Sequence, residues 1–124
     1  MGPGEAMREI FAAWESNDPD GLARLFTEDG VYEDPLKPAR LVGKADVRDG
    51  NAPAMAALDS CRIDIARIVE DGDTGFCEGF FASSLADGSG RLDFPFAMIV
   101  EMRDGLVARC GEYFDTRPLL PQDP

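Results

Sequence analysis

Two carboxylates in apolar surroundings are the residues of this sequence best suited to chemistry. Glu112 is the first, because in a strand predicted over 106–115 it shares one face with apolar side chains, namely Leu106, Ala108, Cys110 and Phe114. Burial of an unpaired carboxylate costs on the order of several kcal/mol, so Glu112 must be paired, protonated or open to a cavity. The alternatives are a bulge that turns this side chain to solvent and a structural hydrogen bond to a helix end.

Asp34 is the second candidate for a catalytic carboxylate. It follows the aromatic residue Tyr32 and precedes Pro35, whose ring restricts the backbone of the residue before it. A carboxylate held in this way can act as a general acid or base. The alternative is that Asp34 simply caps a turn with its side chain, as aspartates before prolines often do.

Several other kinds of chemistry are excluded by composition. The chain has no histidine, which removes the usual general base, the common nucleophile–base pairs and most zinc or iron sites. Its three cysteines, Cys61, Cys77 and Cys110, form no C-x-x-C pair, so we expect reduced, buried thiols. The acids are scattered and resemble no cation-binding loop. We therefore expect neither a bound metal nor any other cofactor.

Length and charge limit the protein class further. The 124 residues predict one domain spanning 1–124, with a loose leader over 1–4 and a loose tail over 118–124. Twenty-four acidic residues against twelve basic ones give a net charge of −12, which opposes binding to nucleic acids and anionic membranes. The sequence shows neither a membrane-spanning run nor a signal peptide, so we expect a cytoplasmic protein.

The N-terminal half of the sequence predicts helices. Apolar residues at helical spacing form a first stripe, made of Met7, Ile10, Phe11 and Trp14. This helix is expected to end near Asn17, and Asp18 then caps a second helix that continues through Phe26. A third helix follows Gly43 and is expected to break at Gly50 and Pro53.

The remaining segments predict strands. A short extended segment over 31–34 and a loop over 35–43 precede four long strands, which we expect at 61–71, 74–85, 91–103 and 106–115. In the third of these, one face is formed by Leu92, Phe94, Phe96, Met98, Val100 and Met102. Helices followed by an antiparallel meander predict an α+β fold. A curved sheet with three helices across its mouth would enclose one pocket.

Four segments carry a resemblance to a known superfamily. They are residues 25–35 (LFTEDGVYEDP), 43–47 (GKADV), 104–107 (DGLV) and 112–115 (EYFD). Together they resemble the nuclear-transport-factor-two-like superfamily, which includes ketosteroid isomerases, limonene-epoxide hydrolases and SnoaL-like polyketide cyclases. The likeness spans roughly residues 6–118 and implies a cystatin-like cone, in which a curved antiparallel sheet and three N-terminal helices surround a small-molecule pocket.

The resemblance to ketosteroid isomerases implies a role for Asp34, which matches the general base of that family. The family's hydrogen-bond donors to the substrate oxygen fall at Ile10 and at Phe96 or Ala97. None of these side chains is a donor, so that oxyanion site is missing here.

The resemblance to limonene-epoxide hydrolases implies roles for two more residues. Tyr32 matches a tyrosine that holds the attacking water, and Glu112 matches the acid of the last strand. Asp34 stands where that family has an asparagine, and its arginine and second acid fall at Gly79 and Phe81. The sequence therefore has two pocket acids and a tyrosine, but the complete set of neither mechanism.

From these residues we predict a cofactor-free isomerase, cyclase, lyase or hydrolase that transfers protons. Asp34 is the expected base, Glu112 the acid or water holder, and Tyr32 a hydrogen-bond donor. The expected ligand is a hydrophobic or aromatic small molecule. Its predicted contacts are Trp14, Phe94, Phe96, Met98 and Phe114.

Two alternatives from other classes stay open. One is a ligand-binding module without catalysis, which the missing donors favour. The other is a structural dimerisation domain. Whatever the function, we expect a homodimer or a larger even oligomer, because the sheet face opposite the pocket carries the partly apolar set Ile99, Val107 and Tyr113.

Overall fold

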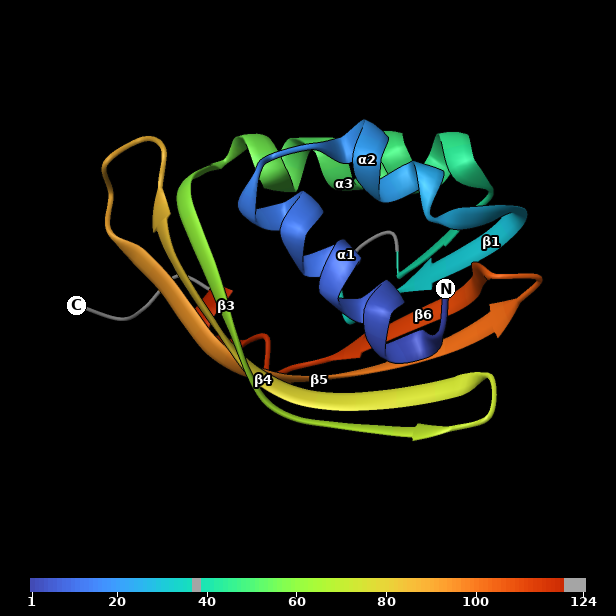
Figure 1. Ribbon diagram of the computed structural model, residues 1–124. Coiled ribbons are helices and arrows are strands. Elements are labelled where there is room, and N and C mark those ends of the chain that lie inside the picture. Colours follow the sequence, from blue (N-terminus) through green and yellow to red (C-terminus); the bar gives the residue numbers. More distant parts are fainter. Residues whose placement is uncertain (37–38, 120–124) are drawn as a thin grey trace.

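Three helices cover one face of a curved six-stranded sheet in the computed structural model, which describes residues 1–36 and 39–119 (Figure 1). The helices are α1 (Pro3–Glu15), α2 (Pro19–Arg24) and α3 (Lys44–Ala56), and a short 3-10 helix, η1, spans Arg117–Leu119. The strands are β1 (Phe26–Glu33), β2 (Arg40–Val42), β3 (Leu58–Asp71), β4 (Thr74–Leu85), β5 (Arg91–Arg103) and β6 (Leu106–Tyr113).

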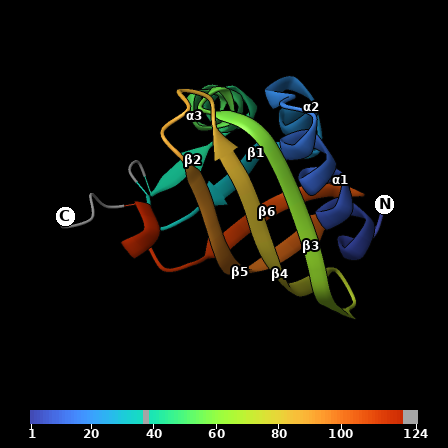
Figure 2. The same ribbon diagram turned by 90° about the vertical axis from the view of Figure 1, so that its left-hand side faces the viewer.

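The sheet has the strand order β2-β1-β6-β5-β4-β3 and is mixed (Figure 2). β6 pairs with β5 in the antiparallel sense and with β1 in the parallel sense. The α+β fold with a curved sheet and three helices is thus confirmed, whereas the expectation of a wholly antiparallel sheet is wrong at one pair. That pair forms because β6, at the far end of the chain, returns beside β1 and runs in its direction.

The long strands match the sequence pattern closely. β4 and β5 have the predicted bounds, and β5 buries every second side chain from Phe94 to Met102. β6 departs from simple alternation, because its register with β5 shifts between Glu101 and Met102. This bulge places Val107 opposite Met102 and fully buries it, so its predicted position on the outer face is wrong.

The first half of the chain differs from the prediction in three places. Phe26 begins β1 instead of ending the second helix, and β2 forms inside the segment 35–43 that was predicted as a loop. α3 runs unbroken through Gly50 and Pro53. A Cβ at Gly50 would lie 2.5 Å from the Leu41 side chain, so this glycine allows α3 to pack closely against β2.

The predicted leader is also wrong in part. α1 begins at Pro3, a position where a helix tolerates proline, and both Pro3 and Gly4 are buried. The backbone N–H of Gly4 donates to Oε1 of Glu70 at 2.7 Å, which ties the start of α1 to β3. Of the predicted tail, residues 118 and 119 belong to η1, and residues 120–124 lie outside the described residues.

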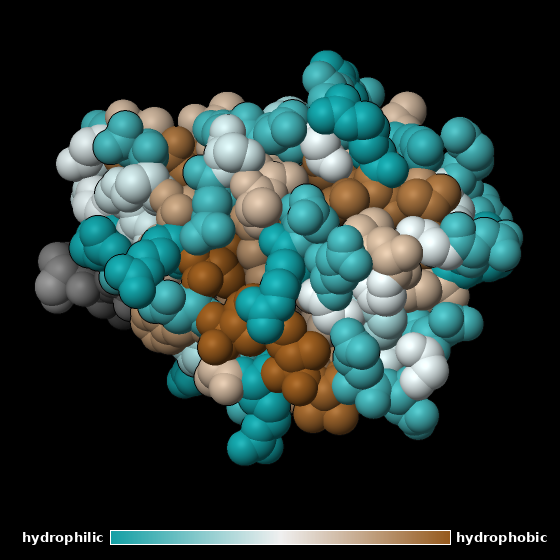
Figure 3. All heavy atoms as spheres, in the orientation of Figure 1, coloured by the Kyte–Doolittle hydropathy of each residue, from teal (hydrophilic) through white to brown (hydrophobic). Residues whose placement is uncertain are grey.

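The core lies between the helices and the inner face of the sheet. α1 supplies Ala6, Met7, Ile10 and Phe11 to it, all at most 4% exposed. Hydrophilic side chains spread over most of the outer surface on the α1 side, and hydrophobic ones gather where α1 packs against β3 (Figure 3). No helix within residues 1–36 and 39–119 is long and apolar enough to span a bilayer.

Candidate functional site

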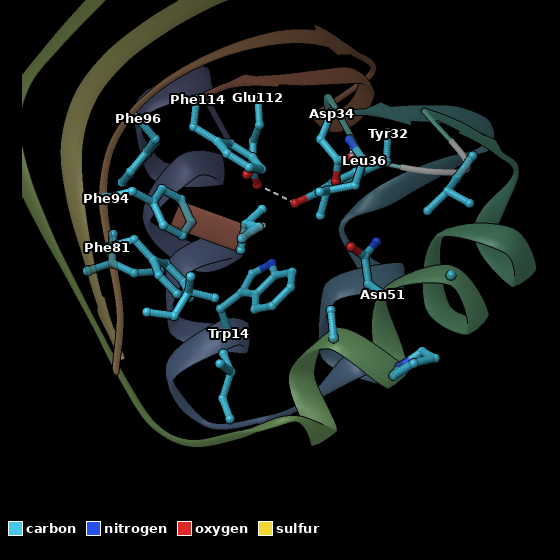
Figure 4. Close-up of a pocket in the computed structure, with 18 of the residues that line it drawn as sticks. Trp14, Tyr32, Asp34, Leu36, Asn51, Phe81, Phe94, Phe96, Glu112 and Phe114 are labelled. Atoms are coloured by element: carbon cyan, nitrogen blue, oxygen red, sulfur yellow. Dashed lines mark hydrogen bonds between the residues drawn. The ribbon is translucent and has the colours of Figure 1, made fainter. Parts of the chain in front are cut away.

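A cavity of about 460 Å³ opens between the inner face of the sheet, α1 and α3 (Figure 4). One wall is aromatic. The ring of Phe94 stacks on Phe81 at a centroid distance of 4.9 Å and packs against Phe114 at 4.8 Å. Trp14 meets Phe81 edge-on at 6.2 Å. Such a wall suits an apolar or aromatic ligand.

Glu112 and Tyr32 form the polar centre of this cavity. Tyr32 lies on β1 opposite Cys110 of β6, so Glu112, two residues further along β6, shares its face of the sheet. The Tyr32 hydroxyl donates a hydrogen bond to Oε1 of Glu112 across these parallel strands (Figure 4). Neither alternative for Glu112 holds, because the bulge in β6 leaves it facing inward and its partner is a side chain of β1, not a helix end.

Burial controls the protonation of this pair. It raises the pKa of Glu112 to about 7, and the charge of Asp34 acts in the same direction, while the hydrogen bond from Tyr32 opposes the rise. Burial, followed by the charge of Glu112, raises the pKa of Tyr32 well above its ordinary value. Near neutral pH, Tyr32 is therefore a donor and Glu112 exchanges between its acidic and basic forms.

Asp34 lies immediately after β1, at the edge of the same cavity (Figure 4). Its Oδ1 accepts a hydrogen bond from the backbone N–H of Leu36 at 2.8 Å, so it does cap a turn. The side chain is half-buried, and this burial raises its pKa although the Leu36 N–H opposes the rise. Within the described residues, Oδ2 of Asp34 makes no hydrogen bond, which leaves this oxygen available to a ligand.

The cavity is acidic as well as apolar. Three carboxylates line it, those of Asp34, Asp49 and Glu112. Among the described lining residues there is neither a lysine nor an arginine. Asp49 is more exposed than the other two and pairs with Arg48 at 2.8 Å. In the described part of the chain, no three side chains of the metal-ligating types come together.

Seven of the eight predicted site residues line this cavity. They are Trp14, Tyr32, Asp34, Phe94, Phe96, Glu112 and Phe114. Met98 does not, since it is fully buried in the core, opposite Cys77 on the neighbouring strand. Its position on the apolar face of β5 was predicted correctly, but that face extends beyond the cavity.

Asn51 is a polar lining residue that the sequence analysis missed. It is 4% exposed, and its Nδ2 donates to the backbone oxygen of Val47 at 2.8 Å. Its side chain points toward the cavity from α3 (Figure 4). The signal was present, because Val47, Asn51 and Met55 repeat at helical spacing, but the expected break at Gly50 concealed it.

Comparison with known families gives one match over most of the chain. The sequence profile described as a SnoaL-like domain matches residues 7–110. Among curated proteins, none matches this sequence significantly.

Solved structures share this architecture at low sequence identity. A hypothetical protein from Catenulispora acidiphila DSM 44928, with a ketosteroid isomerase-like fold and in complex with trimethylamine, is 21% identical over 100% of both chains, with a TM-score of 0.83. A putative isomerase from Bacillus subtilis is 22% identical over 94% of this chain and 88% of that one, with a TM-score of 0.78. An LEH-like epoxide hydrolase from M. tuberculosis is 23% identical over 90% and 81%, with a TM-score of 0.75. These likenesses show the fold.

Proposed function

Since the chain belongs to the SnoaL-like domain family, which fits the predicted resemblance to the nuclear-transport-factor-two-like superfamily, we propose that it is a cofactor-free enzyme that transfers protons. Its substrate is a hydrophobic small molecule bound in the cavity. The reaction is an isomerisation, cyclisation, elimination or hydrolysis. The similarity in fold to an epoxide hydrolase and a putative isomerase supports this range without selecting one member.

The two carboxylates take different roles in this proposal. Burial raises the pKa of Glu112, the negative charge of Asp34 acts in the same direction, and we assign the role of base to Asp34. Glu112, with a pKa of about 7, still carries a proton in a large fraction of molecules at neutral pH and serves as the acid or water holder. Tyr32 orients Glu112 through its hydrogen bond.

The observation that carries the proposal is the environment of this acid pair. The carboxylates of Asp34 and Glu112 and the phenol of Tyr32 line one aromatic cavity, and none of its described lining residues is basic. A purely structural acid is normally paired with a cation or fully hydrogen-bonded. In this proposal the apolar walls exclude water, so the two carboxylates ionise at different pH values. Such a difference allows one of them to act as an acid and the other as a base in the same site.

A carboxylate NMR titration of the wild type and of Asp34→Asn tests the coupling. We expect Glu112 to titrate near 7 in the wild type and at a lower pH in Asp34→Asn, because the neighbouring charge is gone. Asp93→Asn is the matched control, since Asp93 pairs with Arg91 at 3.0 Å and does not line the cavity. If Glu112 titrated near its ordinary pKa of 4.5 in the wild type, in Asp34→Asn and in Asp93→Asn, the proposed site would be contradicted.

Catalysis itself needs a second measurement. Wild type and Asp34→Asn are incubated with a fractionated extract of hydrophobic metabolites, and substrate loss is followed by mass spectrometry. A general base contributes about 10²-fold or more to the rate, so turnover seen with the wild type should fall by that factor in Asp34→Asn. Equal turnover in both proteins would remove Asp34 from the mechanism.

A ligand-binding module without catalysis is the alternative function. It is favoured by Ile10 and Phe96, which stand where the resemblance to ketosteroid isomerases calls for hydrogen-bond donors and have apolar side chains. In that case ligand affinity would change with pH through Glu112, and Asp34→Asn would alter this profile with no turnover to lose.

A homodimer through the outer face of the sheet is compatible with both functions, and we propose it with a corrected surface. Val107 is buried, but Phe76, Phe80 and Tyr113 are large exposed hydrophobic residues of β4 and β6. Sedimentation of a monomer at micromolar concentration would rule the dimer out.

A further inference from the structure

We propose that the indole N–H of Trp14 binds an oxygen atom of the ligand and thereby orients the ligand against the acid pair. This inference rests on the proposed function, because it assumes that the cavity holds a small molecule. It assigns to Trp14 a polar role in addition to the apolar contact predicted from the sequence.

The inference starts from a buried donor without a partner. Trp14 projects from α1 into the lining of the cavity, and its Nε1 is buried with no hydrogen-bond partner among the described residues. Figure 4 shows this nitrogen on the edge of the ring that faces Glu112 and Tyr32 across the cavity. The unpaired donor therefore lies on the edge of the indole ring that is turned toward the acid pair.

An unpaired donor at this place is costly unless something uses it. The indole nitrogen can only donate, and leaving a buried donor unsatisfied destabilises the folded protein. A phenylalanine would keep an edge contact with Phe81 without that cost. The N–H therefore offers the folded protein no advantage until an acceptor reaches it.

Apart from the protonated form of Glu112, the other polar groups described in the cavity are acceptors or are already engaged. The hydroxyl of Tyr32 donates to Glu112, and Nδ2 of Asn51 donates to Val47. What remains toward the cavity is mostly acceptor: the Asn51 side-chain oxygen makes no hydrogen bond within the described residues, and Asp34 has its Oδ2. A ligand that satisfies both ends carries an oxygen acceptor, such as a carbonyl, toward Trp14 and a donor or acidic C–H toward Asp34.

A pair of probes of nearly equal size isolates this contact. Fluorene and fluorenone are planar and apolar and differ by one carbonyl group. If Trp14 donates to that oxygen, fluorenone should bind about five- to tenfold more tightly than fluorene, the range that one additional hydrogen bond supports. Isothermal titration gives both dissociation constants.

The chain has one tryptophan, so its indole group gives a single signal in a proton–nitrogen NMR spectrum. We expect fluorenone to move the indole proton downfield, as a new hydrogen bond does, and fluorene to leave it without that shift. Trp14→Phe should abolish the preference for fluorenone. Phe114→Leu, which changes the same cavity without touching a polar atom, should weaken both probes alike and keep the preference.

The outcomes separate this inference from the proposed function. Binding of both probes with equal affinity, or binding of fluorenone without a downfield shift of the indole proton, would overturn the role of Trp14 and leave the cavity as a ligand site. Binding of neither probe would overturn the role of Trp14 and also contradict the hydrophobic ligand site of the proposed function. If Trp14→Phe does not fold, the wild-type indole signal decides the question alone.

Discussion

The two faces of the β1–β6 strand pair hold the same kind of side chain in opposite electrostatic environments. On the outer face, Glu33 of β1 accepts a hydrogen bond from Nε of Arg109 at 3.0 Å, and both side chains are about one-third exposed, at 37% and 29%. On the inner face, Glu112 has the neutral hydroxyl of Tyr32 and no described cation. Tyr32 and Glu33 are adjacent in β1, so their side chains point to opposite faces of the sheet. The carboxylate on one face therefore has a cation as its partner, and the carboxylate on the other has a neutral phenol.

This difference shows what the cavity does to an acid. On the outer face, the carboxylate of Glu33 is paired with the guanidinium of Arg109 and partly exposed to solvent. On the inner face, burial removes water and the nearest charge is another carboxylate, so the neutral acid is favoured and the pKa of Glu112 rises to about 7. Each of the three predictions that follow alters one side of this comparison.

The largest effect is expected from Glu112→Gln. Between its ordinary pKa of 4.5 and its folded value of about 7, the unfolded chain releases this proton before the folded chain does, so wild-type stability falls as pH rises through that window. The loss amounts to on the order of 3 kcal/mol, and the glutamine variant should not show it. Urea unfolding below and above this window measures the difference.

Glu33→Gln is the matched control for this experiment, because it removes a carboxylate from the outer face of the same strand pair. It should keep the wild-type fall in stability between pH 4.5 and 7, since Glu112 is intact. An unchanged pH profile in Glu112→Gln would show that Glu112 is not the group responsible.

A smaller effect is expected from Tyr32→Phe. The hydroxyl lowers the pKa of Glu112, so its removal should raise that pKa above 7. The cost in stability should be about 2 kcal/mol at high pH, where the ionised acid would lose its donor, and less at low pH. Carboxylate NMR and urea unfolding report the two quantities, and a fall in the Glu112 pKa would contradict the assigned hydrogen bond.

The smallest effect is expected from Arg109→Met on the outer face. A partly exposed ion pair contributes about 1 kcal/mol or less, and salt screens it, so the free energy of unfolding should change little. The pKa of Glu112 should not move, because Arg109 does not contribute to its shift. A displacement of the Glu112 titration comparable to that in Tyr32→Phe would mean that the two faces are not electrostatically separate.

Local patterns in the sequence were sufficient for much of the fold and part of the site. Alternation along β5 and β6 placed Phe94, Phe96 and Glu112 on the inner face, because a strand points successive side chains to opposite sides. The same reasoning failed at Val107, where a bulge adds one residue to β6 and reverses the alternation before it. A bulge depends on the partner strand, so the strand's own sequence does not reveal it.

The sequence analysis also predicted a helix break at Gly50, where packing against another element keeps the helix continuous. α3 continues through this glycine, and the Leu41 side chain of β2 packs closely against it. With the helix continuous, Asn51 falls on its buried face and beside the cavity. Propensity is a weak prior, and packing against another element overrides it.

The sequence by itself determined the secondary elements with strong periodicity, the inward direction of Glu112 and the acidic, histidine-free character of the protein. These depend on neighbours a few residues apart. Only the tertiary structure decided that β6 lies parallel to β1, which joins Tyr32 to Glu112 across 80 positions of sequence. It also decided the pKa of Glu112 and the unpaired indole of Trp14, because desolvation and missing partners are properties of the assembled cavity.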